Sequence, residues 1–282
     1  MLPLKKIYVD SRHRTADSVS SSNFKYELPY TVQLPDNCSF YVSEVSIPHV
    51  WKTIEDDIND RLYVKYTTGP GIGIPNYIVV QLTSQNYTGA TLATEIQTKL
   101  NSMANAFISF TCEYLASPDF SLRIRCSGDN AKFKIYTDTE LLQAGSSIQW
   151  LNNLALLVNV GIPNTANDII KNVVPMSDST ELVTDFVNLQ SINNVYITSP
   201  NLGSFDTIAN FSNNIIKKVP VNVGYGFMIV DNSSDTSDYL NCSRLTLKTI
   251  EFHLRDGRGR YIDLHGMHIT FSIIFNKFNL DN

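Results

Sequence analysis

Apolar and polar residues alternate with a period of two along most of the chain. In the segment FKYELPYTVQL, Phe24, Tyr26 and Leu28 fall on one side of the backbone, and charged residues stand between them. This alternation is typical of a β-strand that buries one face. Similar segments recur at short spacing, and the breaks between them are rich in Gly, Pro, Asn, Asp and Ser. The pattern predicts an all-β fold, an antiparallel sandwich or barrel.

Two segments follow helical spacing instead. In TGATLATEIQTKLNSMANAF, apolar residues repeat at helical intervals from Leu92 to Phe107, and Thr88 or Thr91 can cap the start. The segment SSIQWLNNLALLVNV repeats this pattern behind a serine cap at Ser146 or the next residue. We expect two short helices that lie over an edge or a face of the sheets.

The polar segments suggest the domain boundaries. The Ser-rich stretch SRHRTADSVSSSN predicts that residues 1–22 form an N-terminal arm. The strand-rich remainder, 23–282, predicts one domain, in which 139–190 is a possible helix and loop insertion. No repeat links the first half of the chain to the second, and this argues against two tandem copies of one sandwich.

Composition is consistent with a globular domain. The 282 residues are 43% hydrophobic, enough for a substantial core without disulfides or metals. No stretch of 18 apolar residues occurs, so we expect no membrane-spanning helix, and the N-terminus does not resemble a secretory signal. The cysteines form no CxxC pair and are expected to be free thiols in a reducing compartment: Cys38, Cys112, Cys126 and Cys242.

One short segment runs against the overall charge. The net charge is −5, which argues against a domain that grips nucleic acid over a broad surface. Near the N-terminus, however, Lys5, Lys6, Arg12 and Arg14 are accompanied only by Asp10. These basic residues belong either to a solvated tail or to an arm that contacts a capsid partner or packaged nucleic acid.

Sequence signatures of catalysis are missing. The chain has no GxSxG elbow, HExxH motif or complete phosphate-binding loop, so we expect no enzyme activity and no cofactor. The segment FHLRDGRGRYIDLHGMHITFSIIF gathers histidines and acids that could bind a metal, but such residues also pair across strands in ordinary sheets. We therefore predict neither a metal site nor catalytic residues.

The register of this segment predicts a hairpin. If Asp256 faces Arg260, the loop is Gly257, Arg258 and Gly259, and Gly259 supplies the left-handed residue that three-residue loops need. In this register, apolar side chains face apolar side chains across the strands on one side of the hairpin, and polar side chains face polar ones on the other. Arg258 is expected to be exposed at the tip.

The same register predicts a long hairpin. Further from the turn, Leu247 faces Ile269. Both strands change phase near Thr249 and Gly266, where we expect a bulge or a sharp bend. The polar face is expected to meet either water or a neighbouring subunit.

Several segments, taken in order, resemble the minor capsid, or penton, proteins of Polinton-type elements, adintoviruses and virophages. They are IYVDSRHRTADS with NFKYELP, SFYVSEVSIPHVWKTIEDDINDRLYV, NYTGATLATEIQTKLN, NVYITSPNLGSF with NIIKKVPV, and the closing LKTIEFHLRDGRGRYIDLHGMHITFSIIF. Together they cover most of the chain. Each is a pattern of hydrophobic and turn residues, so their joint order carries the resemblance.

The resemblance implies a jelly-roll β-sandwich without enzyme activity. It implies homopentamers at the fivefold vertices of an icosahedral capsid, assembly inside the host cell, and the major capsid protein of the same particle as a partner. The N-terminal basic residues would add at most a weak genome contact.

Other functions fit the same pattern. One is a major capsid protein with two jelly rolls, and another is a fibre head that binds a receptor or glycan through aromatic loops near Trp51 or Tyr225. An enzyme on a β-sandwich is the least favoured, because the site signatures are missing.

Overall fold

The chain folds into two compact units. The computed structural model describes residues 3–69, 75–144, 158–159, 162–202, 207–208, 212–233 and 238–277. Unit 1 combines Met1–Trp51 with Ile192–Asn282, and unit 2 is Lys52–Ser191. Unit 2 is therefore an insertion into unit 1.

This division differs from the predicted single domain over 23–282 with an insertion at 139–190. The insertion begins much earlier, at Lys52, and contains strands of its own. Strand periodicity is the same in both units, so no local pattern marks which strands share a core. Each unit has a separate cluster of buried hydrophobic residues, and these clusters define the boundary.

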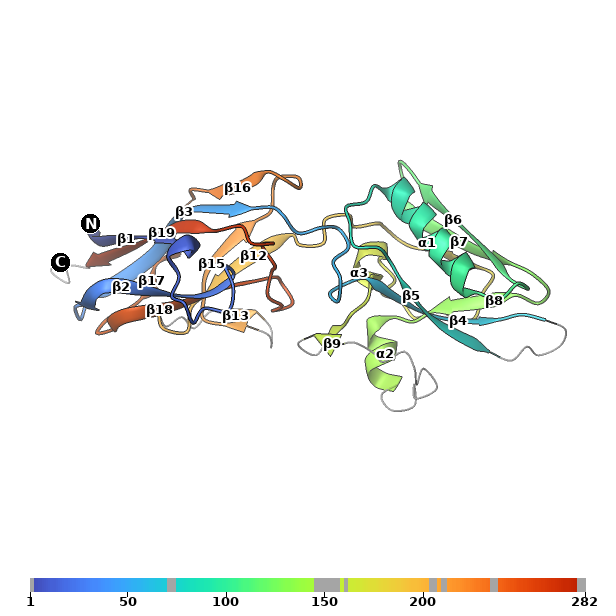
Figure 1. Cartoon of the computed structure of the whole chain (residues 1–282), viewed down its shortest axis with the longest axis horizontal. Coiled ribbons are helices and arrows are strands. Elements are labelled where there is room, and N and C mark those ends of the chain that lie inside the picture. Colours follow the sequence, from blue (N-terminus) through green and yellow to red (C-terminus); the bar gives the residue numbers. More distant parts are fainter. Residues whose placement is uncertain are drawn as a thin grey trace. The chain divides into compact units, whose positions relative to one another are not determined.

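Unit 1 is a jelly-roll β-sandwich. Its eight main strands among the described residues are β1 (Pro3–Asp10), β2 (Asn23–Gln33), β3 (Cys38–Pro48), β12 (Asn194–Thr198), β15 (Ile215–Pro220), β16 (Met228–Asp231), β18 (Thr246–Arg255) and β19 (Thr270–Lys277). One antiparallel sheet has the order β1-β19-β3-β16 and the other β15-β12-β18-β2 (Figure 1). Apart from β12 and β15, strands that follow one another in this series lie in opposite sheets, as in a jelly roll.

Short elements complete unit 1. They are the 3-10 turn η1 (Ser11–His13), the paired strands β13 (Thr207–Ile208) and β14 (Ser212–Asn213), and β17 (Leu240–Asn241), which pairs with β3.

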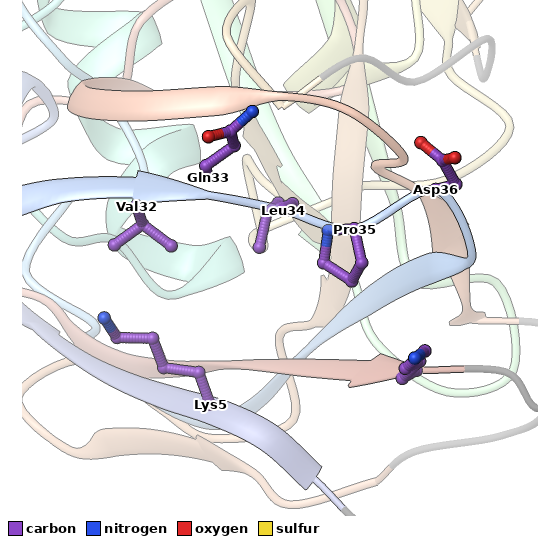
Figure 2. A pocket seen from close by; sticks show the side chains of 7 residues that line it. Lys5, Val32, Gln33, Leu34, Pro35 and Asp36 are labelled. Carbon is purple, nitrogen blue, oxygen red and sulfur yellow. The ribbon is translucent and has the colours of Figure 1, made fainter.

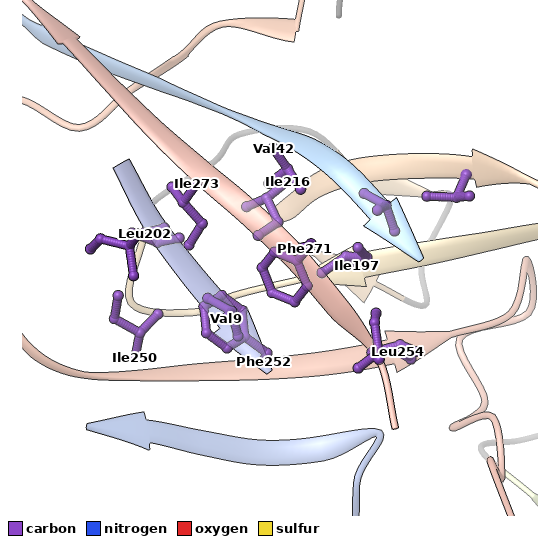
Figure 3. Close-up of a cluster of buried hydrophobic side chains, with 14 of the residues drawn as sticks. Val9, Val42, Ile197, Leu202, Ile216, Ile250, Phe252, Leu254, Phe271 and Ile273 are labelled. Atoms are coloured by element: carbon purple, nitrogen blue, oxygen red, sulfur yellow. The ribbon is translucent and has the colours of Figure 1, made fainter. Parts of the chain in front are cut away.

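Aromatic rings join the two sheets of unit 1. Phe252 of β18 lies 5.5 Å from Phe24 of the neighbouring β2, measured between ring centroids. It also meets Phe271 of β19 edge-on at 5.0 Å, and β19 belongs to the opposite sheet (Figure 3). All three side chains are buried. Such ring pairs add about 0.5–1.5 kcal/mol each beyond the burial of their area.

The predicted N-terminal arm is part of the sandwich. β1 pairs with β19 along its length, and Ile7 and Val9 are buried in the core of unit 1. After η1, the chain folds back on β2, where the Thr15 N–H donates to the Lys25 carbonyl at 2.9 Å. The arm prediction is wrong at β1, because the two adjacent lysines hide a short alternation whose apolar positions are Ile7 and Val9.

The predicted hairpin forms only at its tip. Arg255 pairs with Tyr261, and the Ile262 N–H donates to the Leu254 carbonyl at 3.2 Å. Beyond this point the chain leaves β18 and enters the other sheet as β19, between β1 and β3. The predicted long pairing is wrong, because both strands pair with others: β18 with β2 and, at its end, with β12, and β19 with β1 and β3. A register shift does occur near Thr249, but in the pairing with β2.

Unit 2 contains two three-stranded antiparallel sheets within its described part. Their orders are β5-β4-β8 and β11-β7-β6. The strands are β4 (Arg61–Thr67), β5 (Asn76–Gln81), β6 (Ser109–Leu115), β7 (Ser121–Ser127), β8 (Lys132–Ile135) and β11 (Glu181–Val183), with β9 (Val158–Asn159) and β10 (Ile162–Pro163) as a separate pair. The Phe110 ring of β6 meets the Phe133 ring of β8 edge-on at 5.5 Å, so the core lies between the sheets.

The first predicted helix is confirmed. Helix α1 (Gly89–Met103) begins after Thr88, whose hydroxyl accepts the Thr91 N–H in a capping box. The helix packs on β6 and buries Leu92, Ile96 and Leu100, as its periodicity predicts. The predicted repeat extends too far, because the helix ends at Met103, and Met103 and Phe107 are both exposed.

The second predicted helix falls mostly on 145–157, outside the described residues. Two helices of unit 2 were not predicted, α2 (Asp138–Ala144) and α3 (Asn167–Ile170). At seven and four residues, they are too short to show a clear apolar period.

Candidate functional site

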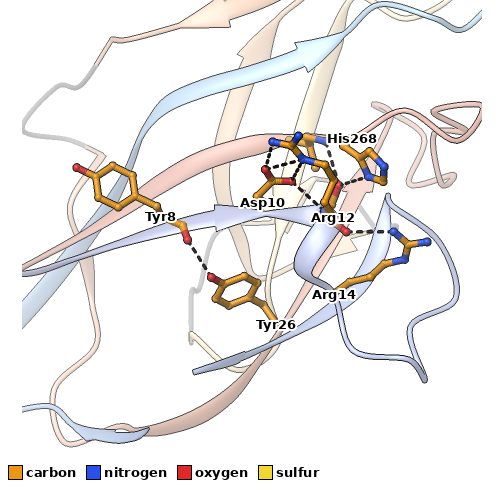
Figure 4. Close-up of polar contacts among 8 residues, drawn as sticks. Tyr8, Asp10, Arg12, Arg14, Tyr26 and His268 are labelled. Carbon is orange, nitrogen blue, oxygen red and sulfur yellow. Dashed lines mark hydrogen bonds and ion pairs between the residues drawn. The ribbon is translucent and has the colours of Figure 1, made fainter. Parts of the chain in front are cut away.

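The four basic residues near the N-terminus have partners within unit 1. The Arg12 guanidinium donates from Nε to Asp10 Oδ2 at 2.9 Å, and Arg14 Nη1 donates to the Ser11 carbonyl at 3.1 Å (Figure 4). Ser11 itself is buried, and its hydroxyl contacts His268 Nδ1 at 3.1 Å. The hydrogen bonds from Arg12 lower the pKa of Asp10. The contact between Ser11 and His268 holds the turn after β1 against the segment that directly precedes β19.

The two lysines are bound to different neighbours. Lys5 Nζ donates to the Tyr30 hydroxyl at 2.9 Å and lies 4.1 Å from the centre of that ring. Lys6 Nζ lies 2.7 Å from a carboxylate oxygen of Glu44, and this hydrogen-bonded pair raises the pKa of Lys6 and lowers that of Glu44. Adjacent residues of a strand point to opposite faces, so the lysines do not form one patch.

The turn at Gly257, Arg258 and Gly259 is organised by a buried ion pair. Asp256 accepts hydrogen bonds from the backbone N–H groups of Arg258 and Arg260, each at 2.9 Å, and from Arg260 Nε at 2.8 Å. Gly259 has a φ of 81°, the left-handed conformation that the loop requires. Arg258 is half-buried rather than exposed as predicted.

The histidines of this segment do not converge. His253 Nε2 contacts Glu251 at 2.8 Å, His265 Nδ1 lies 3.4 Å from Asp263, and His268 contacts Ser11. The first of these contacts joins two residues of β18 that are two positions apart, rather than residues of facing strands. Across the described ranges, no group of three or more His, Cys, Asp or Glu is placed to hold a metal.

An exposed apolar strip lies on β16 and the turn before it. Its members are Tyr225, Phe227, Met228 and Val230, with exposed fractions from 49% to 68%. The β16 strand ends its sheet, with β3 as its only strand neighbour in the described part of the chain. Ile229 points into the core while Met228 and Val230 point out, as strand alternation requires.

A cavity of about 730 Å³ lies on unit 1 where β1 and β19 approach β2. It is lined by Lys5, Lys277 and the segment from Val32 to Asp36 (Figure 2). The lining holds one carboxylate, Asp36, and two lysines.

Sequence reasoning missed the apolar strip. The segment GFMIVD is one of the recurring strand-like segments, but exposure at a sheet edge depends on neighbours distant in sequence. Sequence reasoning also named Trp51 as a possible surface aromatic. Trp51 is buried at 2% exposure and lies 4.4 Å from His49, ring centre to ring centre, whereas Tyr225 is exposed.

Comparison with known proteins gives a likeness in structure. Neither the scan against family models nor the search of curated proteins finds a match. None of the helices in the described ranges has the length and apolar character to cross a membrane. Among solved structures, the chain is similar to the selenomethionine-labelled penton protein of mavirus, with 10% sequence identity and a TM-score of 0.44. The alignment covers 97% of this chain and 100% of that protein.

Proposed function

We propose that this chain is a viral structural protein, the minor capsid or penton protein that forms homopentamers at the fivefold vertices of an icosahedral capsid. The observation that carries the proposal is the strand order of unit 1, with sheets β1-β19-β3-β16 and β15-β12-β18-β2. Jelly rolls of this kind recur in viral capsids. A fold alone does not fix function, so the ordered sequence resemblance is the second support.

The architecture favours a minor over a major capsid protein with two jelly rolls. Only unit 1 has the jelly-roll order, whereas the described part of unit 2 is built on two three-stranded sheets. Unit 2 follows β3 and precedes β12 in the chain. We propose that it is an elaboration of one jelly roll and not a second copy.

A pentamer needs a heterologous contact that closes into a ring. The apolar strip at Tyr225, Phe227, Met228 and Val230 is suited to such a contact, because β16 has one strand neighbour in the described ranges and carries exposed apolar side chains. We propose a second copy of this chain as its occupant. The role is structural and requires neither catalysis nor a cofactor.

Oligomer size tests the proposal directly. The full chain is measured by light scattering and native mass spectrometry, alone and after co-expression with a candidate major capsid protein. We expect five copies, either at once or only with the major capsid protein. A stable trimer that binds glycans would contradict the proposal and favour a fibre head.

Matched variants test the contact surface. Val230→Asp places a charge in the apolar strip, and we expect it to shift the pentamer toward monomer at equal concentration. Phe107→Asp is the control, because Phe107 is 74% exposed on unit 2 and outside the strip. Pentamers that resist Val230→Asp but dissociate with Phe107→Asp would place the contact elsewhere.

The basic residues near the N-terminus are poorly placed for a genome contact. The cations of Lys5, Lys6, Arg12 and Arg14 are each engaged within unit 1. Removal of residues 1–14 would delete β1 and damage the sandwich, so single substitutions are the sharper test. Arg12→Gln should leave DNA binding by the purified protein unchanged.

A further inference from the structure

Two of the four cysteines face each other inside unit 1, although they are 204 positions apart in the chain. Cys38 begins β3, and Cys242 directly follows β17, which pairs antiparallel with β3 through Asn241 opposite Ser39. The next pair in this register is Cys242 opposite Cys38. The Cys242 N–H donates to the Cys38 carbonyl at 3.0 Å, and the two sulfur atoms lie 3.3 Å apart.

We propose that Cys38 and Cys242 form a disulfide bond when the protein meets an oxidising medium. Directly opposed residues of an antiparallel pair have Cα atoms about 4.5–5.5 Å apart, within the span that disulfides bridge. A disulfide is about 2.05 Å long, so the sulfurs must approach by about 1.3 Å from their separation of 3.3 Å. Side-chain rotation can supply this movement without a change in strand register.

The backbone around the pair is held in place. Ser243 Oγ accepts from the Cys38 N–H and also lies within hydrogen-bonding distance of the Cys38 carbonyl, both at 3.3 Å. The two strands therefore keep the cysteines opposed whether or not the bond is formed.

The other two cysteines are not placed in this way. On β6 and β7 of unit 2, Cys112 stands opposite Ile124, and Cys126 stands opposite Phe110. Neither faces a second thiol across the strands. Of the four cysteines, all of which lie in described ranges, only Cys38 and Cys242 are in contact.

Burial slows oxidation of the pair. Both side chains are almost fully buried, and this burial raises the pKa of each thiol. The thiolate is the nucleophile, so reaction at neutral pH is slow. Cys38 nevertheless lines a surface cavity of about 400 Å³ with Asp36, Tyr239 and Asn241, and we propose that a small oxidant reaches the pair from this side.

Hydrogen peroxide serves as that oxidant. The sulfur of Cys38 attacks one peroxide oxygen, an S–O bond forms, the O–O bond breaks, and water leaves. The sulfur of Cys242 then attacks the sulfenic sulfur, the S–S bond forms, the S–O bond breaks, and a second water leaves. Together the thiols lose two electrons and two protons, and one peroxide becomes two waters.

The bond would clamp a large part of the fold. The closed loop runs from Cys38 to Cys242 and includes all of unit 2 with β12, β15 and β16. Cross-linking such a long loop restricts the unfolded chain, so the oxidised protein should melt at a higher temperature by roughly 5–10 °C. If the chain has the proposed function, on which this consequence rests, the disulfide would form after a particle is released from the host cell.

Thiol counting tests the bond itself, whatever the oligomeric state. The full chain is reduced, freed of reductant, treated with hydrogen peroxide, denatured, alkylated with iodoacetamide and mapped by mass spectrometry. We expect four alkylated cysteines before oxidation and two afterwards, with one cross-linked peptide pair that contains Cys38 and Cys242. Four alkylated cysteines after treatment, a bridge to Cys112 or Cys126, or oxidation of Cys38 to a sulfinic acid without a bridge would overturn the proposal.

Thermal melting supplies the second readout. The Cys112→Ser/Cys126→Ser variant should keep the rise in melting temperature on oxidation, and Cys242→Ser should lose it. If Cys242→Ser does not fold, disulfide mapping of the unsubstituted chain by mass spectrometry still shows whether Cys38 and Cys242 are bonded. A rise that persists in folded Cys242→Ser would show that another oxidation stabilises the protein.

Discussion

At the scale of single residues, the turn after β18 depends on one buried ion pair. Asp256 and Arg260 are 5% and 8% exposed, and the Asp256 carboxylate also accepts two backbone N–H groups. A buried charge that loses its partner is far more costly than an exposed one. The pair therefore determines whether this loop can close over the sandwich.

We expect Asp256→Ala to lower the free energy of unfolding by about 3–5 kcal/mol, because it breaks a buried ion pair with Arg260 and also removes the acceptor of two backbone N–H groups. Chemical denaturation followed by fluorescence measures the change. Asp263→Ala is the control, since that side chain is 74% exposed, and its effect should stay within about 0.5 kcal/mol. Equal effects for the two variants would contradict this role of Asp256.

Surface carboxylates of unit 1 make a second, pH-dependent contribution. A hydrogen bond from Lys25 lowers the pKa of Asp17 to about 2, from an ordinary value of 3.8. A carboxylate whose folded pKa is lowered stabilises the fold above its unfolded pKa, and this stabilisation is lost as the pH falls through the folded value. The contribution of Asp17 is thus complete above about pH 4 and disappears toward pH 2.

Asp17→Asn should therefore lower the melting temperature at pH 7, and the difference from the unmodified protein should shrink between pH 4 and pH 2. Thermal unfolding followed by circular dichroism over this range provides the test. Asp119→Asn, at an exposed position of unit 2, makes the same isosteric change as a control. A difference for Asp17→Asn that stays constant down to pH 2 would exclude the ion pair as its cause.

At the scale of elements, α1 shows how far local sequence determines structure. Its cap and its buried residues Leu92, Ile96 and Leu100 follow from residues within the helix and one residue before it. β18 and β19 show the opposite case. Their residues are complementary enough to suggest one long hairpin, yet each strand pairs with two others, so only the tip at Tyr261 remains paired.

Thr88→Ala should destabilise unit 2 by about 1 kcal/mol, because it removes the side chain that caps α1. The same substitution at Thr94, in the exposed middle of the helix, should be neutral or slightly stabilising, since alanine favours helices more than threonine does. The denaturant midpoints of the two variants measure these changes in stability. Similar losses at both positions would mean that the cap contributes little.

At the scale of the whole molecule, the insertion enters and leaves unit 1 at neighbouring points. The Ser191 hydroxyl donates to the Lys52 carbonyl at 3.0 Å, so the two ends of unit 2 are joined. Unit 2 also has its own buried cluster, which contains residues of both sheets and of α1. These features are typical of an inserted domain that can fold alone.

We expect a fragment of residues 52–191 to fold by itself, with a cooperative unfolding transition and dispersed amide signals in its NMR spectrum. A second protein, in which a short Gly-Ser linker joins Trp51 to Ile192, should fold as well. Calorimetry of the full chain should resolve two transitions at the temperatures of the two parts. A fragment without cooperative unfolding would show that unit 2 depends on unit 1.

Much of the fold can be predicted from local pattern. The strands, α1 and the left-handed Gly259 are encoded by period, caps and glycine placement, each of which acts over a few residues. The candidate site could be predicted less well. The basic residues are easy to find, but their partners, such as Tyr30 for Lys5 and Glu44 for Lys6, lie 25 and 38 residues away.

The sequence by itself determined that this protein is rich in antiparallel strands, where its first helix lies, and how its last tight turn is made. Only the tertiary structure decided that β1 belongs to the sandwich, that β18 and β19 part into opposite sheets, and that Lys52–Ser191 forms a second unit. The physical reason is competition. A strand has two edges and one buried face, and which partners fill them depends on every other strand in the chain.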